Sequence, residues 1–158
     1  VEEIARWQRK DPRIHLVIIG TDRDAMYAQE CRRIAALLPG IHILSPIPAD
    51  DLHAAMQESD AVLNSSHSEG LSNALLEAMH IGTPVIARDI PGNRAIVRNG
   101  ETGLLFRTVE EFLECAEKLL SDTSLRRQLI AGAQQLIETD FALEREAEAY
   151  AKLISGLH

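Results

Sequence analysis

The chain has 158 residues, enough for one compact domain with a hydrophobic core, and 46% of them are hydrophobic, as in ordinary globular proteins. Its net charge of -8 would repel a phosphate backbone, so we expect no binding to nucleic acid. The sequence contains no apolar run long enough to span a bilayer and no recognisable signal peptide. The only cysteines, Cys31 and Cys115, are far apart, which favours free thiols in a reducing compartment over a disulfide. We therefore expect a cytoplasmic protein without a transmembrane segment.

Hydrophobic runs alternate with helical patterns and predict an α/β fold, a Rossmann-like doubly wound parallel sheet over residues 14–106. The expected strands are 14–19, 41–44, 61–64, 85–87 and 104–106, and the expected helices are 1–10, 24–38, 50–58, 71–81 and 94–98. The continuous apolar run 14–19 is typical of a strand buried on both faces. Asp24 and Asp22 are favoured as caps of the second helix, and Asp50 or Asp51 as the cap of the third.

The strands cease after residue 107, and the remaining sequence has three helical patterns rich in Ala, Leu, Glu and Arg. These patterns cover residues 109–120, 124–138 and 143–154. We expect a helical C-terminal tail, residues 108–156, that packs over the sheet as part of a single domain formed by residues 1–158.

The most informative segment is 66–79, which lies between two strand-like runs. A strand that passes through small polar residues and Gly70 into a helix forms an anion site, because the first helical amides lack internal partners and the helix dipole is positive there. Glu69 precedes this helix and Glu77 lies inside it, and carboxylates accept hydrogen bonds from hydroxyl groups. The pattern therefore suggests a phosphate flanked by sugars.

Plainer interpretations of these residues stay open. Glu69 can be a favourable charge at a helix terminus, and Glu77 can lie on a solvated face with Asn73 and His80. Gly70 is a stronger candidate, because close approach of a ligand or a positive φ requires glycine, although a plain turn does too. The apolar side of the helix is expected to contain Leu71, Leu75, Ala78 and Met79. Ser65, Ser66 and Ser68 could donate to a phosphate, but turns and caps use serine as readily and are favoured here, and Asn64 at the strand end is predicted as a turn residue.

Two further loops follow strands at the same edge of the predicted sheet. Gly20 and Asp22 follow the first strand, and Gly92 and Asn93 follow the fourth, so these loops are candidates for lining a ligand cleft, with turns as the alternative. The histidines show no metal-ligand spacing, and His67 is notable only for its place near Glu69. The sequence lacks a Walker phosphate loop, a Gly-x-Gly-x-x-Gly fingerprint and a nucleophile elbow.

The chain resembles the donor-binding half of the retaining glycosyltransferases of family four. The resemblance rests on 69–72 with Glu77-Ala78-Met79, on Gly82-Thr83-Pro84-Val85-Ile86-Ala87, and on 99–106, and it extends from residue 14 to 106. It implies the C-terminal, nucleotide-sugar-binding half of a GT-B fold, whose N-terminal half binds the acceptor.

The resemblance also assigns roles to individual residues. Glu69 would contact hydroxyls of the donor sugar as the catalytic residue, and Glu77 would contact the ribose. The amides of Gly70 and Leu71 would hold the diphosphate of a nucleoside diphosphate sugar, with no metal or other cofactor. Further candidate contacts to the nucleotide sugar are Ser72, Ser66, Gly20, Gly92 and Asn93.

Three departures from the family pattern affect the expected function. The acceptor domain is missing, and so is the first strand of the donor domain with its basic pair. Pro91-Gly92-Asn93 and Ala95 replace a glycine pair and a downstream glutamate. We expect this chain alone to be inactive, and its sheet to have an unpaired seam that a neighbour, a second copy in a homodimer or a local rearrangement closes. The alternative functions are a non-catalytic Rossmann-like interaction module and an unrelated nucleotide binder of flavodoxin-like topology.

Overall fold

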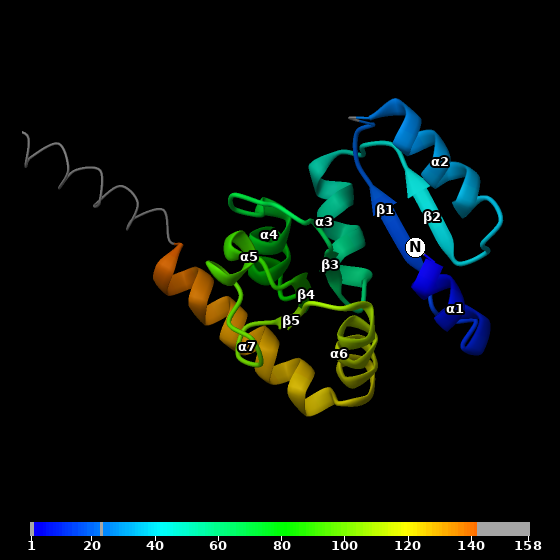
Figure 1. Ribbon diagram of the computed structural model, residues 1–158. Helices are drawn as coiled ribbons and strands as arrows, with labels where there is room; N and C mark the ends of the chain where they lie inside the picture. Colours follow the sequence, from blue (N-terminus) through cyan, green and yellow to red (C-terminus); the bar gives the residue numbers. More distant parts are fainter. Residues whose placement is uncertain (1, 23, 142–158) are drawn as a thin grey trace, which may run out of the picture. The chain divides into compact units, whose positions relative to one another are not determined.

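The computed structural model describes residues 2–22 and 24–141. The chain divides into two compact units, unit 1 (Val1–Leu52) and unit 2 (His53–His158), each of which is described by itself (Figure 1). The helix predicted for 143–154 lies outside the described residues.

Unit 1 has a two-stranded parallel sheet, with one helix between its two strands. Its elements are α1 (Glu2–Lys10), β1 (Leu16–Ile19), α2 (Ala25–Ala35), β2 (Ile41–Leu44) and the start of α3 (Ala49–Glu58). Leu16 lies opposite Ile41 in the ladder. Asp24 begins α2 as predicted, because its carboxylate accepts the Tyr27 amide at 3.0 Å.

The prediction that the first strand is buried on both faces is wrong for this structure. Val17 is 51% exposed and Ile18 is 37% exposed, although they belong to opposite faces of β1. β1 pairs with β2 alone in the described residues, and a strand buries a face only where another layer packs on that face. An apolar run therefore predicts a buried strand only when both faces of the sheet are covered.

Unit 2 contains a three-stranded parallel sheet in the order β3-β4-β5. Its elements after α3 are β3 (Val62–Asn64), α4 (Asn73–Ile81), β4 (Val85–Arg88), α5 (Pro91–Arg94), β5 (Leu104–Phe106), α6 (Val109–Ser121) and α7 (Thr123–Asp140). The central strand β4 is the core of the unit, with Val85 and Ala87 fully buried and Ile86 3% exposed. Parallel pairing brings the carboxyl ends of β3 and β4 to one edge.

Helices cover this sheet as the amphipathic patterns predict. Leu75, Ala78 and Met79 of α4 are fully buried, and α4 ends at Gly82, which adopts φ +83°, a left-handed conformation that favours glycine. Helix α6 packs on β4 and β5, and α7 packs along α4. The predicted helical tail is therefore confirmed for its two described helices.

The described strands form two sheets, β1-β2 and β3-β4-β5, and not one. In a doubly wound sheet of order 3-2-1-4-5-6, strand 1 lies between strands 2 and 4. Removal of strand 1 from that order leaves one pair and one triplet, which is the observed pattern. The expected seam in the predicted sheet of 14–106 is thus consistent with the pairing, and its closure by a homodimer or another neighbour stays a prediction.

Several helix boundaries differ from those predicted. Helix α3 begins at Ala49, so Asp50 and Asp51 lie in its first turn and neither is the cap. Helix α5 spans Pro91–Arg94, earlier than the predicted 94–98, because proline is favoured in the first turn of a helix, where its missing amide costs no bond. Helix α4 begins at Asn73, two residues later than predicted, which leaves Gly70 and Leu71 in the preceding loop.

Gly92 brings the loop after β4 into close contact with the loop after β3. A Cβ atom at this position would lie 2.3 Å from the carbonyl oxygen of Glu69 and 2.5 Å from that of Gly70. Both contacts are to backbone, which cannot rotate away as a flexible side chain can. The close approach of these loops therefore requires glycine at position 92.

We expect Gly92→Ala to lower the free energy of unfolding by about 1–3 kcal/mol, because the added methyl group overpacks this contact. Urea unfolding of the purified protein measures the change. Gly70→Ala is the matched control, since a Cβ there meets nothing within 4 Å. Equal losses for the two variants would contradict the packing role of Gly92.

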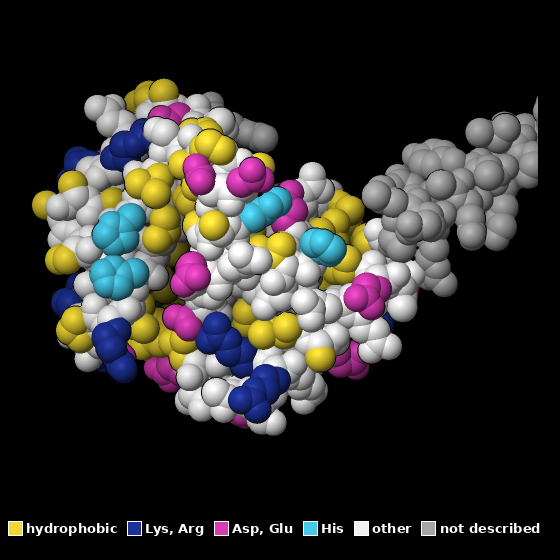
Figure 2. Space-filling model, turned by 180° about the vertical axis from the view of Figure 1, so that it is seen from behind, with side chains coloured by type: hydrophobic (Ala, Val, Ile, Leu, Met, Phe, Trp, Pro, Cys, Tyr) yellow, Lys and Arg dark blue, Asp and Glu magenta, His cyan; other side chains and the backbone are white. Residues whose placement is uncertain are grey.

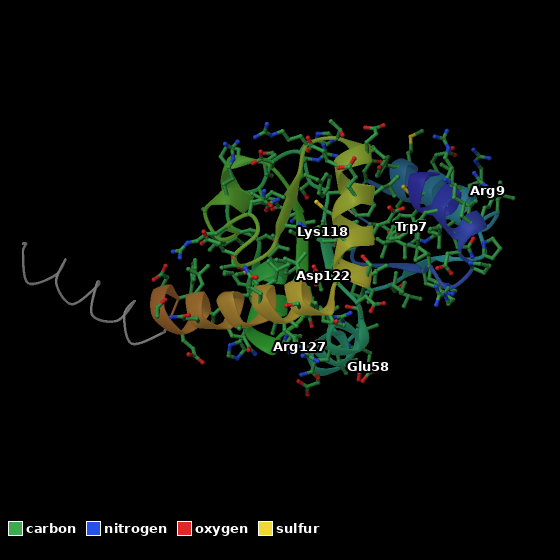
Figure 3. All side chains as sticks on the ribbon, turned by 90° about the horizontal axis from the view of Figure 1, so that it is seen from below. Trp7, Arg9, Glu58, Lys118, Asp122 and Arg127 are labelled. Atoms are coloured by element: carbon green, nitrogen blue, oxygen red, sulfur yellow. The ribbon has the colours of Figure 1, made fainter. Side chains whose placement is uncertain are left out.

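Asp122 lies at the corner between α6 and α7 (Figure 3). Its Oδ1 accepts the amides of Ser124 at 3.0 Å and Leu125 at 2.9 Å, which otherwise have no partner in the first turn of α7. The sharp turn that lets α7 pack on α4 thus depends on one carboxylate.

Asp122→Ala should cost about 1 kcal/mol of stability, since alanine cannot accept these bonds. Asp122→Ser keeps a capping oxygen and should therefore retain most of this stability. Thermal and urea unfolding of both variants provide the measurement. The same unfolding midpoint for the alanine and serine variants would refute the cap.

Candidate active site

The candidate site lies in unit 2, where β3 and β4 end. β3 ends at Asn64 and leads through residues 65–72 into α4, and β4 ends at Arg88 and leads into α5. Parallel pairing places these two strand ends side by side, and the absence of a side chain at Gly92 lets their loops lie in contact. The structure thus brings the predicted segments 64–77 and 88–93 together at one edge of the sheet.

Glu69 is half-buried in the loop between β3 and α4. Its Oε1 lies 3.3 Å from Nδ2 of Asn64, which donates to it. One carboxylate can accept about four hydrogen bonds, so this single bond leaves capacity for hydroxyl groups of a ligand.

Glu77 points from the second turn of α4. Its side chain is 43% exposed, and its Oε2 lies 3.3 Å from Nε2 of His53 on α3, whose side chain is 39% exposed. Asn73 and His80 are exposed as well, so the predicted polar face reaches the surface. Figure 2 shows acidic and histidine side chains next to one another on the face it presents.

Gly70 and Leu71 form an open stretch of loop just before the cap of α4. A Cβ at Gly70 would meet nothing, and within the described residues a positive φ occurs only at Gly82 and Gly100. Backbone strain is therefore no reason for glycine at position 70. Leu71 is 49% exposed, so its predicted place on the apolar side of the helix is wrong.

The cap residue Ser72 is buried, but its side chain makes no capping bond to the described amides of α4. Its hydroxyl accepts instead from Nδ2 of Asn64 at 3.1 Å. The positive end of the α4 dipole thus carries no side-chain cap at Ser72. Ser66 takes part in a turn, because its amide donates to Oδ1 of Asn64 at 3.0 Å.

Asn93 is completely buried. Its Nδ2 donates to the carbonyl of Arg88 at 2.9 Å and to Oδ1 of Asn64 at 3.3 Å. In this structure Asn93 supports the site from the core side. Direct contact of Gly92 or Asn93 with a ligand stays a prediction.

Gly20 belongs to unit 1, whereas the other predicted site residues belong to unit 2. It follows β1, and its amide donates to Leu44 at 3.4 Å. Asp22 forms a bidentate pair with Arg32 at 2.7 and 2.8 Å, and the hydrogen bonds from Arg32 lower the pKa of the Asp22 carboxyl. The predicted cap role of Asp22 is therefore replaced by this ion pair.

Sequence reasoning missed three residues of the site. Asn64 was predicted only as a turn residue, and it does accept the Ser66 amide, but it also contacts Glu69 and Ser72. His53 was not singled out, because its partner Glu77 is distant in sequence. Arg88 donates from Nε to the carbonyl of Ser65 at 3.0 Å, and only its place at the end of β4 could have indicated this.

Cys31 and Cys115 are free thiols, and both are partly buried. Burial raises the pKa of the Cys115 thiol, which lowers the fraction of the side chain that is present as the thiolate. Among the residues that the structure describes, no group of three or more His, Cys, Asp or Glu side chains could hold a metal ion. Every helix within 2–22 and 24–141 is too short or too polar to cross a membrane.

The sequence comparisons identify relatives of the whole chain. Glycosyltransferase 1 domain-containing protein 1 of Xenopus tropicalis is 38% identical over 156 residues, which are 99% of this chain and 45% of that protein. The sequence around 64–66 and 90–93 predicts this relation, which is thereby confirmed. Trehalose synthase of Pyrococcus horikoshii is 29% identical over 139 residues, 88% of this chain and 30% of that protein. The chain thus spans less than half the length of these relatives.

Solved structures share the fold. The C-terminal domain of the glycosyl transferase group 1 family protein LpcC from Francisella tularensis has a TM-score of 0.74 at 24% identity, covering 90% of this chain and 77% of that one. Anabaena HepE has a TM-score of 0.82 at 20% identity, covering 97% of this chain and 44% of that one. The predicted Rossmann-like C-terminal half of a GT-B fold is confirmed. Because the model of the family described as glycosyl transferases group 1 matches residues 1–136, the chain belongs to this family.

Proposed function

We propose that this chain is the donor-binding part of a glycosyltransferase that transfers a sugar, with retention of anomeric configuration, from a nucleoside diphosphate sugar. The observation that carries the proposal is the arrangement of residues 64–77 at the end of β3. Two accessible carboxylates lie on either side of loop amides that lead to a helix start without a side-chain cap from Ser72. A diphosphate with a sugar at each end has the matching charges and hydroxyls.

In this proposal the amides of Gly70 and Leu71 bind the diphosphate just before the α4 terminus. They add to the field of the helix dipole, and this stabilises the charge that develops on the diphosphate as the bond from the sugar to phosphate breaks. No metal is needed for that step. Because α4 begins at Asn73, these two amides belong to the loop before the helix and not to its first turn.

The two carboxylates would serve opposite ends of the donor. Glu69 would accept hydrogen bonds from hydroxyls of the donor sugar, and Glu77 would accept from the ribose. The imidazole of His53 would orient the Glu77 carboxylate from the α3 side. HepE, which shares this fold, was solved in complexes with UDP-glucose and with UDP, which supports this class of ligand.

The second candidate function is a non-catalytic Rossmann-like module for association with a partner. The observation that favours it is Ala95, which stands where the family often has a glutamate and is exposed beside α5. In the first candidate function, the acceptor would be bound by a part of the protein outside this chain. Loss of activity on replacement of Glu69 in the full-length protein would exclude the non-catalytic alternative.

We expect the full-length protein to bind a sugar nucleotide, and titration calorimetry with UDP-glucose, GDP-mannose and ADP-glucose will identify the base. Glu77→Gln should weaken binding of the nucleoside diphosphate and of the sugar nucleotide by the same factor, about tenfold, because both ligands contain the ribose. Glu69→Gln should weaken binding of the sugar nucleotide only, since the nucleoside diphosphate lacks the donor sugar.

The control for these variants is Glu117→Gln, an exposed change on α6 of the same charge and size. It should leave every affinity unchanged. A folded full-length protein that binds none of the three sugar nucleotides would overturn the proposed function.

A further inference from the structure

The amide side chain of Asn64 connects four groups of the candidate site. Its Oδ1 accepts from the Ser66 amide at 3.0 Å and from Nδ2 of Asn93 at 3.3 Å. Its Nδ2 donates to Oε1 of Glu69 at 3.3 Å and to the hydroxyl of Ser72 at 3.1 Å. We call these groups, with Asn64 itself, the Asn64 network.

The Asn64 network uses the full hydrogen-bonding capacity of one amide, two acceptor lone pairs and two N–H groups. A rotation of the amide by 180° would face its NH2 group toward two donors, the Ser66 amide and the Asn93 NH2. The network therefore determines which side of Asn64 faces Glu69. A side chain with only one polar atom could make part of this pattern but not all of it.

The network is anchored in the core. Asn93 has no exposed surface, and its Nδ2 also donates to the carbonyl of Arg88 at the end of β4. Its own Oδ1 has no hydrogen-bond partner among the described residues. A buried acceptor without a partner lowers stability, so the Oδ1 atom gives no reason for an asparagine at position 93. The two hydrogen bonds that its NH2 group donates do give a reason.

The two donor bonds of Asn64 lie on either side of the proposed diphosphate site. One holds the side chain of Glu69 and the other holds that of Ser72, and Gly70 and Leu71 are the residues between them. The loop has no regular secondary structure of its own here, so these bonds limit its motion. Glu69 is thereby held from the protein side, which leaves Oε2 for a ligand.

We propose that Asn64 is a positioning residue that acts through Glu69: it sets the carboxylate for the donor sugar and the Gly70–Leu71 amides for the diphosphate. This inference rests on the proposed function and assigns a specificity role to a residue that touches neither reactant. Asn64 should increase the affinity of the site for a sugar nucleotide relative to its affinity for the free nucleoside diphosphate.

The test is a double-mutant cycle in the full-length protein. Asn64→Asp keeps the size and the Oδ1 acceptor, but it replaces both donors by a carboxylate oxygen that repels the carboxylate of Glu69, so it should weaken binding of the sugar nucleotide about tenfold more than binding of the nucleoside diphosphate. Adding Asn64→Asp to Glu69→Gln should reduce the preference for the sugar nucleotide no further than Glu69→Gln alone does, because both changes act on the same contact between Asn64 and the Glu69 carboxylate. The ligand is whichever of UDP-glucose, GDP-mannose and ADP-glucose the unchanged protein binds.

Asn99→Asp is the matched control, since Oδ1 of Asn99 accepts the Leu105 amide at 2.9 Å and the acceptor is kept. It should change neither affinity. If Asn64→Asp does not fold, Asn64→Ser provides the second variant, because serine can still accept the Ser66 amide and cannot reach Glu69. Additive effects of Asn64→Asp and Glu69→Gln would overturn the inference.

Hydrogen exchange without ligand separates this inference from the proposed function. In Asn64→Asp the amides of Gly70 and Leu71 should exchange faster, while those of α7 stay unchanged. Suppose that Asn64→Asp speeds exchange at Gly70 and Leu71 but the unchanged protein binds no sugar nucleotide. The proposed function would then be wrong, while the positioning of the loop by Asn64 would stand. Unchanged exchange at Gly70 and Leu71 would disprove that positioning itself.

Discussion

The structure of the candidate site depends on the close approach of two loops at the ends of neighbouring parallel strands. A Cβ at Gly92 would overlap the carbonyl groups of Glu69 and Gly70, so the two backbones lie in direct contact. This contact brings Asn93 under the loop that carries Glu69. Parallel pairing of β3 with β4 makes the approach possible, since it places both strand ends at the same edge.

The rigidity of this edge comes from the apolar core beneath it. The middle residues of β4 are buried, and Leu75, Ala78 and Met79 fasten α4 to the sheet with no exposed surface. A carboxylate on such a helix, as Glu77 is, has a defined position, whereas a carboxylate on a loop needs a tether. The hydrogen bond from Asn64 gives Glu69 that tether. The two glutamates are therefore positioned by different physical means.

The chain belongs to the glycosyl transferases group 1 family, and each unit has a parallel sheet of its own, β1-β2 in unit 1 and β3-β4-β5 in unit 2. Val17 and Ile18 on β1 are exposed, since a strand buries a face only where another layer packs on that face. The resemblance described from the sequence rests on the segment around Glu69 and Glu77, and the departures expected from it are at Pro91-Gly92-Asn93 and Ala95. At these positions the structure shows a packing role for Gly92 and a hydrogen-bonding role for Asn93.

The sequence by itself determined the parallel α/β class, every described strand to within two residues, and the edge at which Glu69 and Glu77 lie. Hydrophobic runs and helical periodicity are local signals, so they predict elements and their order. Only the tertiary structure decided how the polar side chains pair. Asn64 with Asn93, and His53 with Glu77, are more than twenty residues apart, and no local pattern marks such pairs. Tertiary context likewise decided that the apolar run of β1 is partly exposed, because burial depends on what packs on the faces of the sheet and not on the run itself.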